Sequence, residues 1–172
     1  MTSQALQFPD MTEAVFKAGM RQLVGGVTAV TTMHEGRQAG LTATAVCSVS
    51  AEPPRLLVCV NCRGETYEMI GASRIFSVNI LAREHEDLAK RFAGMLPLAS
   101  GDKFEGDGWD SAATGAPMLK NALASFDCRV SMIMDTGSHG VVIGDIQHVR
   151  VRDGGSPLLY SSGEFTTTAI GA

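Results

Sequence analysis

The segment VTAVTTMHEGRQAGLTATAVCSV, residues 27–49, decides the fold. Its two halves, Val27 to Thr32 and Gln38 to Val49, are rich in β-branched residues, which favour strands. Between them, His34-Glu-Gly-Arg37 has the composition of a hairpin turn in which the glycine supplies a positive φ. The segment therefore predicts two antiparallel strands joined by a tight turn, and Pro53-Pro54 ends the unit.

Further strands and helices are predicted on both sides of this hairpin. The chain between Arg55 and Asn61 is apolar without interruption, which is typical of a central strand covered on both faces. The other predicted strands are Ile75 to Leu81, Ala122 to Met134, Val141 to Val151 and Pro157 to Tyr160. The predicted helices are Thr12 to Leu23, Glu65 to Ala72 and His85 to Ala93. A glycine-rich loop is expected from Gly101 to Gly115.

The first and last of these helices have an apolar face. Asp10 is the expected cap of the first helix, with Glu13 three residues later. Its apolar face consists of Val15, Phe16, Met20 and Leu23. The inward face of the last helix consists of Leu88, Ala89 and Phe92.

These elements predict one mainly β domain that spans residues 1–172. Strands that follow one another through tight turns pair antiparallel, and about seven of them must close or stack to remove their edges. A β-barrel with peripheral helices satisfies this requirement. Neither a repeat nor a linker in the sequence indicates a second domain.

Composition excludes several classes of function. The net charge of −4, with lysine and arginine scattered, provides no positive field for nucleic acid. No apolar run approaches the roughly 20 residues of a membrane span, and residues 1–10 do not resemble a signal peptide, so we expect a cytoplasmic protein. The four cysteines are too few to stabilise a secreted domain of this length through disulfide bonds, and they are expected to be reduced.

Sequence motifs for metals and nucleotides are incomplete or absent. Cys59-Val-Asn-Cys62 has CxxC spacing but lacks a second ligand pair, and the histidines form no HExxH motif, so no metal site is predicted. Neither a GxGxxG nor a GxxxxGK[ST] motif occurs, which argues against a Rossmann turn and a P-loop. No GxSxG motif supports a serine hydrolase.

The stretch from Gly40 to Ser50 alternates hydroxyl and small apolar residues. In a strand, this alternation places Thr42 and Thr44 on one face and Ala43 and Ala45 on the other. Small side chains let a flat ring approach the backbone, and hydroxyl and N–H groups can hold a phosphate or a carbonyl. The alternative is a solvated strand face that needs no ligand.

Seven short segments occur in an order and spacing that resemble the flavin reductase-like family, over about Phe16 to Tyr160. They are Gly25-Gly-Val-Thr-Ala-Val-Thr31, Gly40 to Ser50, Pro53-Pro54, Phe76-Ser-Val-Asn79, Leu88-Ala-Lys-Arg-Phe92, Gly115-Ala-Pro117, and Gly137-Ser-His-Gly140 with Gly144-Asp145. The resemblance implies an FMN-binding split β-barrel and a homodimer. FMN, or FAD in some members, lies near the subunit interface of such proteins and is reduced by NADH or NADPH.

The resemblance also implies which residues contact the flavin. Those beside the ring are Thr42, Ala43, Thr44 and Ala45 on the strand and Cys47, Ser48, Val49 and Ser50 in the following turn. Those at the phosphate and ribityl chain are Asn61, Arg63 and Thr66, with Arg91 and Phe92 nearby, and Asn79 is included in the cofactor site. The helix that begins near Glu65 would add its first N–H groups. The alternatives are a surface charge for Arg91, a core position for Phe92 and a satisfied buried amide for Asn79.

His139 is the residue that the resemblance places at the nicotinamide pocket. It occupies the Gly-Asp-His turn of the family, but Ser138 replaces the usual aspartate and Gly140 replaces a common hydroxyl residue. The pyridine nucleotide is therefore expected to be held differently. The alternative is an ordinary exposed loop histidine.

The implied reaction is hydride transfer from NADH or NADPH to FMN or FAD, which supplies reduced flavin to a partner monooxygenase. Flavin chemistry requires mainly alignment from the protein, so the lack of an evident catalytic dyad is compatible with this reaction. Two alternatives stay open: an FMN-dependent corrinoid reductase of cobalamin synthesis, and a non-catalytic flavin- or haem-binding split barrel.

Overall fold

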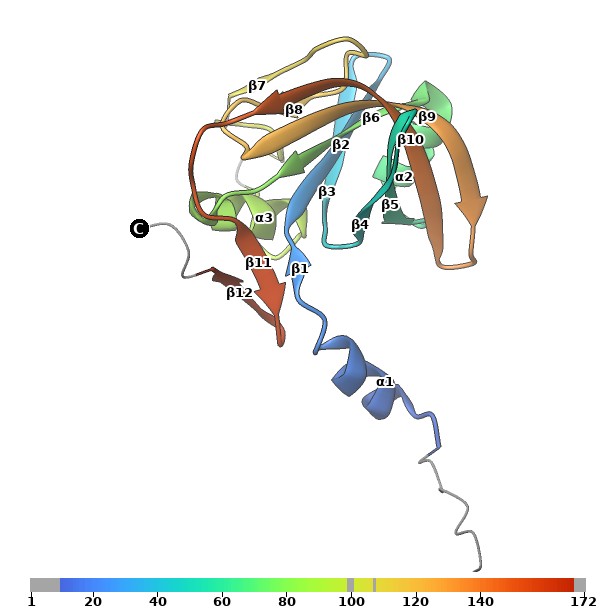
Figure 1. The fold of residues 1–172 in the computed structure, drawn as a ribbon, viewed down its shortest axis with the longest axis vertical. Helices are drawn as coiled ribbons and strands as arrows, with labels where there is room; N and C mark the ends of the chain where they lie inside the picture. Colours follow the sequence, from blue (N-terminus) through green and yellow to red (C-terminus); the bar gives the residue numbers. More distant parts are fainter. Residues whose placement is uncertain (1–9, 99–100, 107, 169–172) are drawn as a thin grey trace, which may run out of the picture.

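A seven-stranded antiparallel sheet forms the body of the protein (Figure 1). The computed structural model describes residues 10–98, 101–106 and 108–168. Along the sheet, the strand order is β3-β2-β6-β9-β10-β5-β4. The bounds are β2 Thr28–His34, β3 Arg37–Ala43, β4 Val46–Ala51, β5 Pro54–Asn61, β6 Ile75–Ile80, β9 Ala124–Asp135 and β10 His139–Val151.

Two smaller sheets and four helical segments complete the chain. One sheet has the order β1-β11-β12 and the other pairs β7 with β8. The bounds of these strands are β1 Gly25–Gly26, β7 Trp109–Asp110, β8 Met118–Leu119, β11 Leu158–Ser161 and β12 Glu164–Thr167. The helical segments are α1 Glu13–Met20, α2 Glu65–Ser73, the 3-10 segment η1 Arg83–His85 and α3 Glu86–Phe92. The predicted mainly β fold with peripheral helices is confirmed.

The sheet curls until its first and last strands approach each other. β3 and β4 are the two edge strands, yet only Thr44 and Ala45 separate them in the sequence. The amide of Cys59 on β5 donates to the carbonyl of Ala45, at 3.0 Å. The barrel is therefore split between β3 and β5.

Two apolar clusters support this arrangement. The first fills the barrel and includes Val30, Val58, Phe76 and Val142, all completely buried. The second lies beneath α3, where the predicted inward residues Leu88, Ala89 and Phe92 are buried as expected. A set of buried polar groups joins the two regions: Asn79 donates to the carbonyl of Ala29 at 3.1 Å and accepts from the amide of Leu119 at 2.8 Å.

Several predicted boundaries were wrong. The long strand Gln38 to Val49 is divided at Thr44 and Ala45 into β3 and β4. β5 is the penultimate strand rather than a central one, and its residues alternate between buried and more exposed positions. The loop expected from Gly101 to Gly115 contains β7, and β12 was not predicted.

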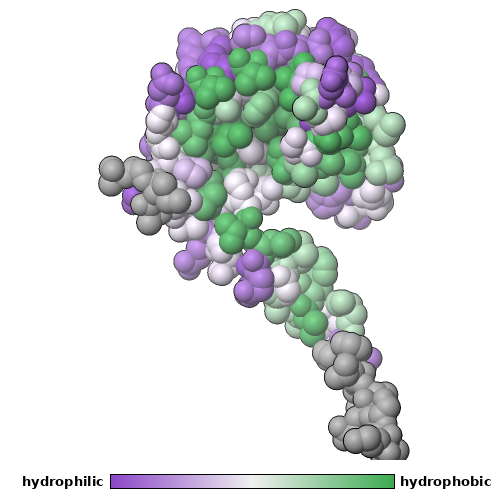
Figure 2. Space-filling model, viewed as in Figure 1, coloured by the Kyte–Doolittle hydropathy of each residue, from purple (hydrophilic) through white to green (hydrophobic). Residues whose placement is uncertain are grey.

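Helix α1 projects from the body of the protein as an arm (Figure 1). Its cap is Thr12, whose hydroxyl accepts from the amide of Val15, and not Asp10 as expected; the helix ends at Met20, before Leu23. The apolar residues of this arm, Val15, Phe16, Met20 and Leu23, are between 42% and 63% exposed. Figure 2 shows hydrophobic side chains along the arm. Nothing among the described residues covers them.

The described residues also bear on membrane spans and metal sites. Over the described ranges, each helix is too short or too polar to cross a bilayer. Within the same ranges, no three histidine, cysteine or acidic side chains come together as metal ligands would.

Candidate functional site

A groove follows β3 where the barrel is split, and it consists of three adjoining cavities. The polar cavity has a volume of about 390 Å³ and lies between β3, the start of α2 and the loop at residues 101–104. The central cavity, of about 370 Å³, lies between β3 and β5. The apolar cavity, of about 220 Å³, lies between β3 and the aromatic residues Tyr160 and Phe165. Leu41 and Asn61 line both the polar and the central cavity, and Thr42 to Thr44 line both the central and the apolar cavity.

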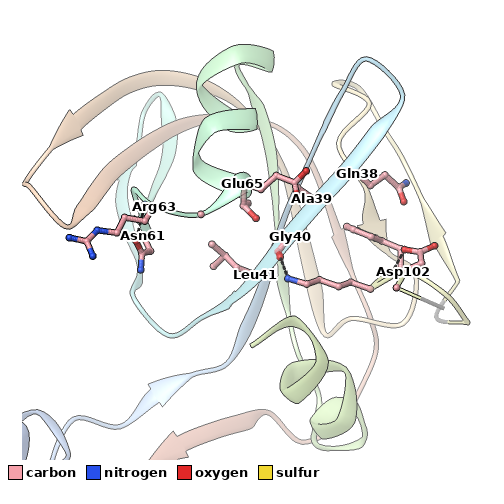
Figure 3. Close-up of a pocket in the computed structure, with 13 residues that line it drawn as sticks. Gln38, Ala39, Gly40, Leu41, Asn61, Arg63, Glu65 and Asp102 are labelled. Carbon is pink, nitrogen blue, oxygen red and sulfur yellow. Dashed lines mark hydrogen bonds between the residues drawn. The ribbon is translucent and has the colours of Figure 1, made fainter. Parts of the chain in front are cut away.

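The polar cavity is bordered by two cationic residues, two acidic residues, Glu65 and Asp102, and a helix N-terminus, and the side chain of Arg63 points outward from its rim (Figure 3). Arg63 and Lys103 line it, and the Nζ of Lys103 donates to the carbonyl of Gly40 at 3.2 Å. The backbone amides at the start of a helix have no partner inside the helix and carry partial positive charge. In α2 these include the amides of Glu65 and Thr66, which both line the cavity. The cavity can therefore hold an anion.

The turn from β5 into α2 aims the helix at this cavity. Asn61 ends the strand, and its Oδ1 accepts from the amide of Arg63 at 2.9 Å. Gly64, the N-cap residue, donates its amide to the carbonyl of Asn61 at 3.2 Å. Glu65 lies at the first helical position, and the guanidinium of Arg37 holds its carboxylate at 2.5 Å. This ion pair partly offsets the negative charge that Glu65 brings to the cavity.

Where the polar cavity meets the central cavity, the backbone of β3 is closely approached by other groups. The carbonyl of Gly40 accepts from Lys103 and so points to the free edge of the strand. Strand alternation turns the backbone groups of Gln38 and Thr42 to the same edge. A Cβ at position 40 would lie 2.5 Å from Cε1 of Phe92, so only glycine lets the ring of Phe92 lie there. The hydroxyl of Thr42 donates to the carbonyl of Ala89 at 2.6 Å, so this hydroxyl anchors α3.

His139 lies at the far side of the central cavity, at the start of β10. It pairs in register with Asn61 of β5, and both residues line the cavity. Its ring Nδ1 lies 3.0 Å from the hydroxyl of Ser138. The histidine is exposed, so its ring is accessible to a molecule in the groove.

Most of the site residues predicted from the sequence lie along this groove. The structure brings together Thr42, Ala43, Thr44, Ala45, Asn61, Arg63, Thr66, Phe92 and His139. Thr66 and Phe92 are almost completely buried, at 5% and 2% exposure, and Phe92 also packs on Phe104 in the core. Phe92 therefore contacts the groove with only a small part of its surface, and the rest of its side chain packs in the core.

Six of the predicted residues do not line the three cavities. Cys47, Ser48, Val49 and Ser50 lie on the edge strand β4, where the hydroxyl of Ser50 donates to the carbonyl of Pro53 at 2.6 Å. Arg91 donates to the carbonyl of Glu105 at 2.8 Å. Asn79 is completely buried and has partners for its amide on β2, β6 and the chain around β8 and β9, so the structure places it in the core.

Other groove residues were not predicted from the sequence. Lys103 is one of these, because it lies in the loop after α3, far along the chain from β3 and α2. Gly40 and Leu41 belong to the segment that the resemblance singled out, but neither was predicted as a contact. The signal for Gly40 would have been its place opposite the helix that carries Phe92, which only the fold reveals.

Comparison with known proteins places this geometry in a family. The model of the flavin reductase like domain matches residues 20–169. An FMN reductase (NADH) named RutF 2 from Rhizobium rhizogenes is 44% identical over 160 residues, which cover 93% of this chain and 91% of the relative. The RutF of Agrobacterium fabrum, also an FMN reductase (NADH), is 38% identical over 145 residues, 84% of this chain and 82% of the relative.

Two solved structures have the same fold. The flavin reductase PheA2 superimposes with a TM-score of 0.84 at 31% identity, over 92% of this chain and 99% of its own. BorF, the flavin reductase component of a bacterial two-component tryptophan halogenase, superimposes with a TM-score of 0.82 at 29% identity, over 91% and 98%. The chain described here therefore belongs to the flavin reductase like domain family.

Proposed function

We propose that this chain acts as one flavin reductase domain that transfers hydride from NADH to FMN. The observation that carries the proposal is the groove of the split barrel, which has an anion site at one end and a free strand edge in the middle. The FMN reductase (NADH) relatives, at 38% and 44% identity, favour FMN over FAD and NADH over NADPH.

The polar cavity suits the phosphate of FMN. Lys103 and, from the rim of the cavity, Arg63 provide positive charge, and the amides of Glu65 and Thr66 provide donors at the start of α2. A dianionic phosphate is stabilised by such a combination of cations and helix N-terminal amides. Asn61, at the junction of the polar and central cavities, is placed to contact the ribityl chain.

The central cavity suits a flat ring. Ala43 and Ala45 keep the side chains beside β3 short, and the free edge of the strand presents backbone donors and acceptors. When bound, the flavin supplies a ring that accepts hydride from a nicotinamide. The protein aligns the two rings, and His139 is placed to orient the nicotinamide on the open side of the cavity.

The face outside β4, β5, β9 and β10 supports a homodimer. Paired residues in adjacent strands share a face, so the register places seven apolar or thiol side chains together on this outer face. They are Met132, Met134, Val141, Ile143, Leu57, Cys59 and Cys47. Met132 and Met134 are 56% and 53% exposed. Monomers rarely expose a contiguous apolar surface of this kind.

A second copy of this chain is the occupant that we propose for the outer face. The arm α1 exposes an apolar stripe of its own, and an isologous dimer lets each copy cover the other. The outer face continues into the central cavity through Cys59, so the partner would close the open side of the site. Reduced flavin would then serve a separate partner enzyme, as the two-component system of BorF suggests, and component B of a nitrilotriacetate monooxygenase, another solved structure of this fold, favours a monooxygenase as that partner. A cytoplasmic location, where nicotinamide nucleotides are available, is part of this proposal.

The direct test is spectroscopic. Purified protein titrated with FMN should bind it. NADH should then remove the absorbance at roughly 450 nm that is characteristic of the oxidised flavin. The same titrations with FAD and NADPH measure both preferences. Colour that persists after NADH and NADPH would remove the reductase proposal and favour a non-catalytic flavin-binding protein. Failure to bind either flavin would remove both.

A further inference from the structure

The turn that carries His139 rests on helix α2. Tyr67, the third residue of α2, lies with its ring against the backbone of Gly140, the residue after His139. A Cβ at position 140 would lie 2.2 Å from Cε2 and 2.8 Å from Cζ of Tyr67. Real Cβ atoms essentially never come so close to another heavy atom, so any larger residue at position 140 must move the ring or the strand.

Backbone conformation is not the reason for this glycine. Gly137, in the same turn, has a φ of 98°, which favours glycine, but Gly140 is not among the residues with positive φ. The requirement at position 140 is the close approach of Tyr67. The glycine at position 140 is therefore matched to the ring of Tyr67 on α2.

Cys62 makes a second contact with the same turn. Its amide donates to the carbonyl of Ser138 at 3.0 Å, and its side chain is an electrostatic neighbour of the Tyr67 phenol. Burial, together with the neighbouring side chain of Cys62, raises the pKa of Tyr67 above its usual value, so the phenol stays protonated at neutral pH. Cys62 and Tyr67 thus hold the turn on both sides of His139.

Within the turn, the backbone around His139 is braced by its own residues. The amide and the hydroxyl of Thr136 both donate to the carbonyl of His139, at 2.9 Å and 2.6 Å. The amide of Gly137 donates to Oδ1 of Asp135 at 2.7 Å. The turn therefore behaves as one unit, and a displacement at Gly140 is transmitted to the imidazole of His139.

We propose that Tyr67 is a positioning residue that, matched to Gly140 and linked to Cys62, sets the place of His139 over the central cavity. This inference rests on the proposed function. The first residues of α2 line the polar cavity and its third residue supports His139, so one short helix fixes the flavin phosphate and the nicotinamide side of the groove.

The experiment compares Gly140→Ala, Tyr67→Ala and the double variant. In Gly140→Ala, the clash should displace His139 and raise KM for NADH by about 10- to 100-fold, the range expected when a positioning group moves by roughly 1 Å. The Kd for FMN should stay within about twofold of wild type, because the polar cavity is untouched. Tyr67→Ala removes the support of the turn without a clash, so it should raise KM for NADH less than Gly140→Ala does. The double variant should recover from the level of Gly140→Ala to that of Tyr67→Ala, since removal of the ring gives the new Cβ space.

Gly71→Ala is the matched control. Gly71 lies on the same helix, and a Cβ there would meet nothing within 4 Å, so KM for NADH should not change. Tyr67→Phe removes the phenol hydroxyl but keeps the ring, and it should therefore affect KM less than Gly140→Ala does. Thermal unfolding of each variant is measured in parallel, and the comparison uses variants that remain folded at the assay temperature.

Two results would overturn the inference. One is an equal loss of FMN affinity and NADH use in Gly140→Ala, which would indicate a general structural effect. The other is a double variant no better than Gly140→Ala, which would show that the two residues are not matched. The NMR shifts of the His139 imidazole give an activity-independent readout: they should move in Gly140→Ala and approach those of Tyr67→Ala in the double variant. Failure of the proposed function would instead appear in the wild type, as absent FMN binding or absent bleaching.

Discussion

Lys103 adds a positive charge to the polar cavity, whose other lining residues come mainly from β3 and the start of α2. It extends from the loop after α3 to the carbonyl of Gly40, beside the amides that begin α2. Lys103→Ala should weaken FMN binding by about tenfold, because a hydrogen bond to a charged group contributes about 1.5 kcal/mol or more. Binding of riboflavin, which has no phosphate, should be unchanged. Fluorescence titration with both ligands measures the difference.

Lys120→Ala is the control for that experiment. Lys120 is an exposed lysine that does not line the groove, so its loss changes the net charge by the same amount without removing a contact. An equal weakening of FMN and riboflavin in Lys103→Ala would contradict the assignment, since the lost contact would then not be to a phosphate.

Cys128 is a residue whose burial makes stability depend on pH. Desolvation, with a smaller contribution from the carboxylates of Asp127 and Asp145, raises the pKa of its thiol from 9.0 to about 12. The folded protein therefore holds this proton more tightly than the unfolded chain does. The thiol's contribution is complete below pH 9 and is lost as the pH rises toward 12, at up to about 1.4 kcal/mol per pH unit.

Urea unfolding at a series of pH values between 9 and 11 tests this prediction. The wild type should lose stability with pH more steeply than Cys128→Ala, whereas Cys47→Ala, which removes an exposed thiol, should parallel the wild type. Equal slopes for wild type and Cys128→Ala would show that the thiol does not contribute.

At the scale of elements, the contact between β3 and α3 depends on Gly40. The ring of Phe92 occupies the space where a Cβ would lie, and Thr42 anchors α3 two residues further along β3. Gly40→Ala should lower the free energy of unfolding by about 1–3 kcal/mol through overpacking. In contrast, Gly71→Ala, in open space on α2, should raise it by about 0.5–1 kcal/mol because alanine favours a helix. Chemical denaturation of both variants measures the two signs, and a stable Gly40→Ala would show that α3 can shift at little cost.

Sequence periodicity predicted most of these elements correctly for a physical reason. Residues in β6 and α3 are chosen mainly by burial, and burial leaves a pattern that can be read along the chain. The division at Thr44 and Ala45 could not be predicted in this way, because the residues before and after it have the same strand-forming composition. The separation of β3 from β4 is a consequence of barrel closure rather than of local preference.

The candidate site was predictable to a similar extent. Residues within one strand or turn, such as Thr42 to Ala45 and Asn61 to Thr66, were assigned together because they are adjacent in the chain. Lys103 joins them only through the tertiary fold. For Asn79 the sequence left two roles open, because a buried amide and a ligand-binding amide are the same residue type, and its burial and hydrogen bonds favour the core role.

At the scale of the whole molecule, the exposed apolar surfaces have to be accounted for. The outer face and the arm α1 together expose methionine, phenylalanine and leucine side chains that neither sheet nor helix of the same chain covers among the described residues. An interface that buries such residues is stabilised mainly by the hydrophobic effect, and a charge at its centre is strongly unfavourable. This gives the dimer proposal a direct test.

Met132→Glu places a carboxylate in the outer face, where the side chain pairs with Ile143 and lies in the same row as Leu57. Light scattering should give twice 18.1 kDa for the wild type and 18.1 kDa for the variant. Because the partner is proposed to close the central cavity, the monomer should also bind FMN roughly tenfold more weakly, equivalent to about 1.4 kcal/mol.

Gln147→Glu adds the same charge at an exposed position of β10 and should leave both mass and affinity unchanged. A wild type that is monomeric throughout a wide range of concentrations would remove the homodimer, while a monomeric Met132→Glu with full FMN affinity would show that each chain completes its own site.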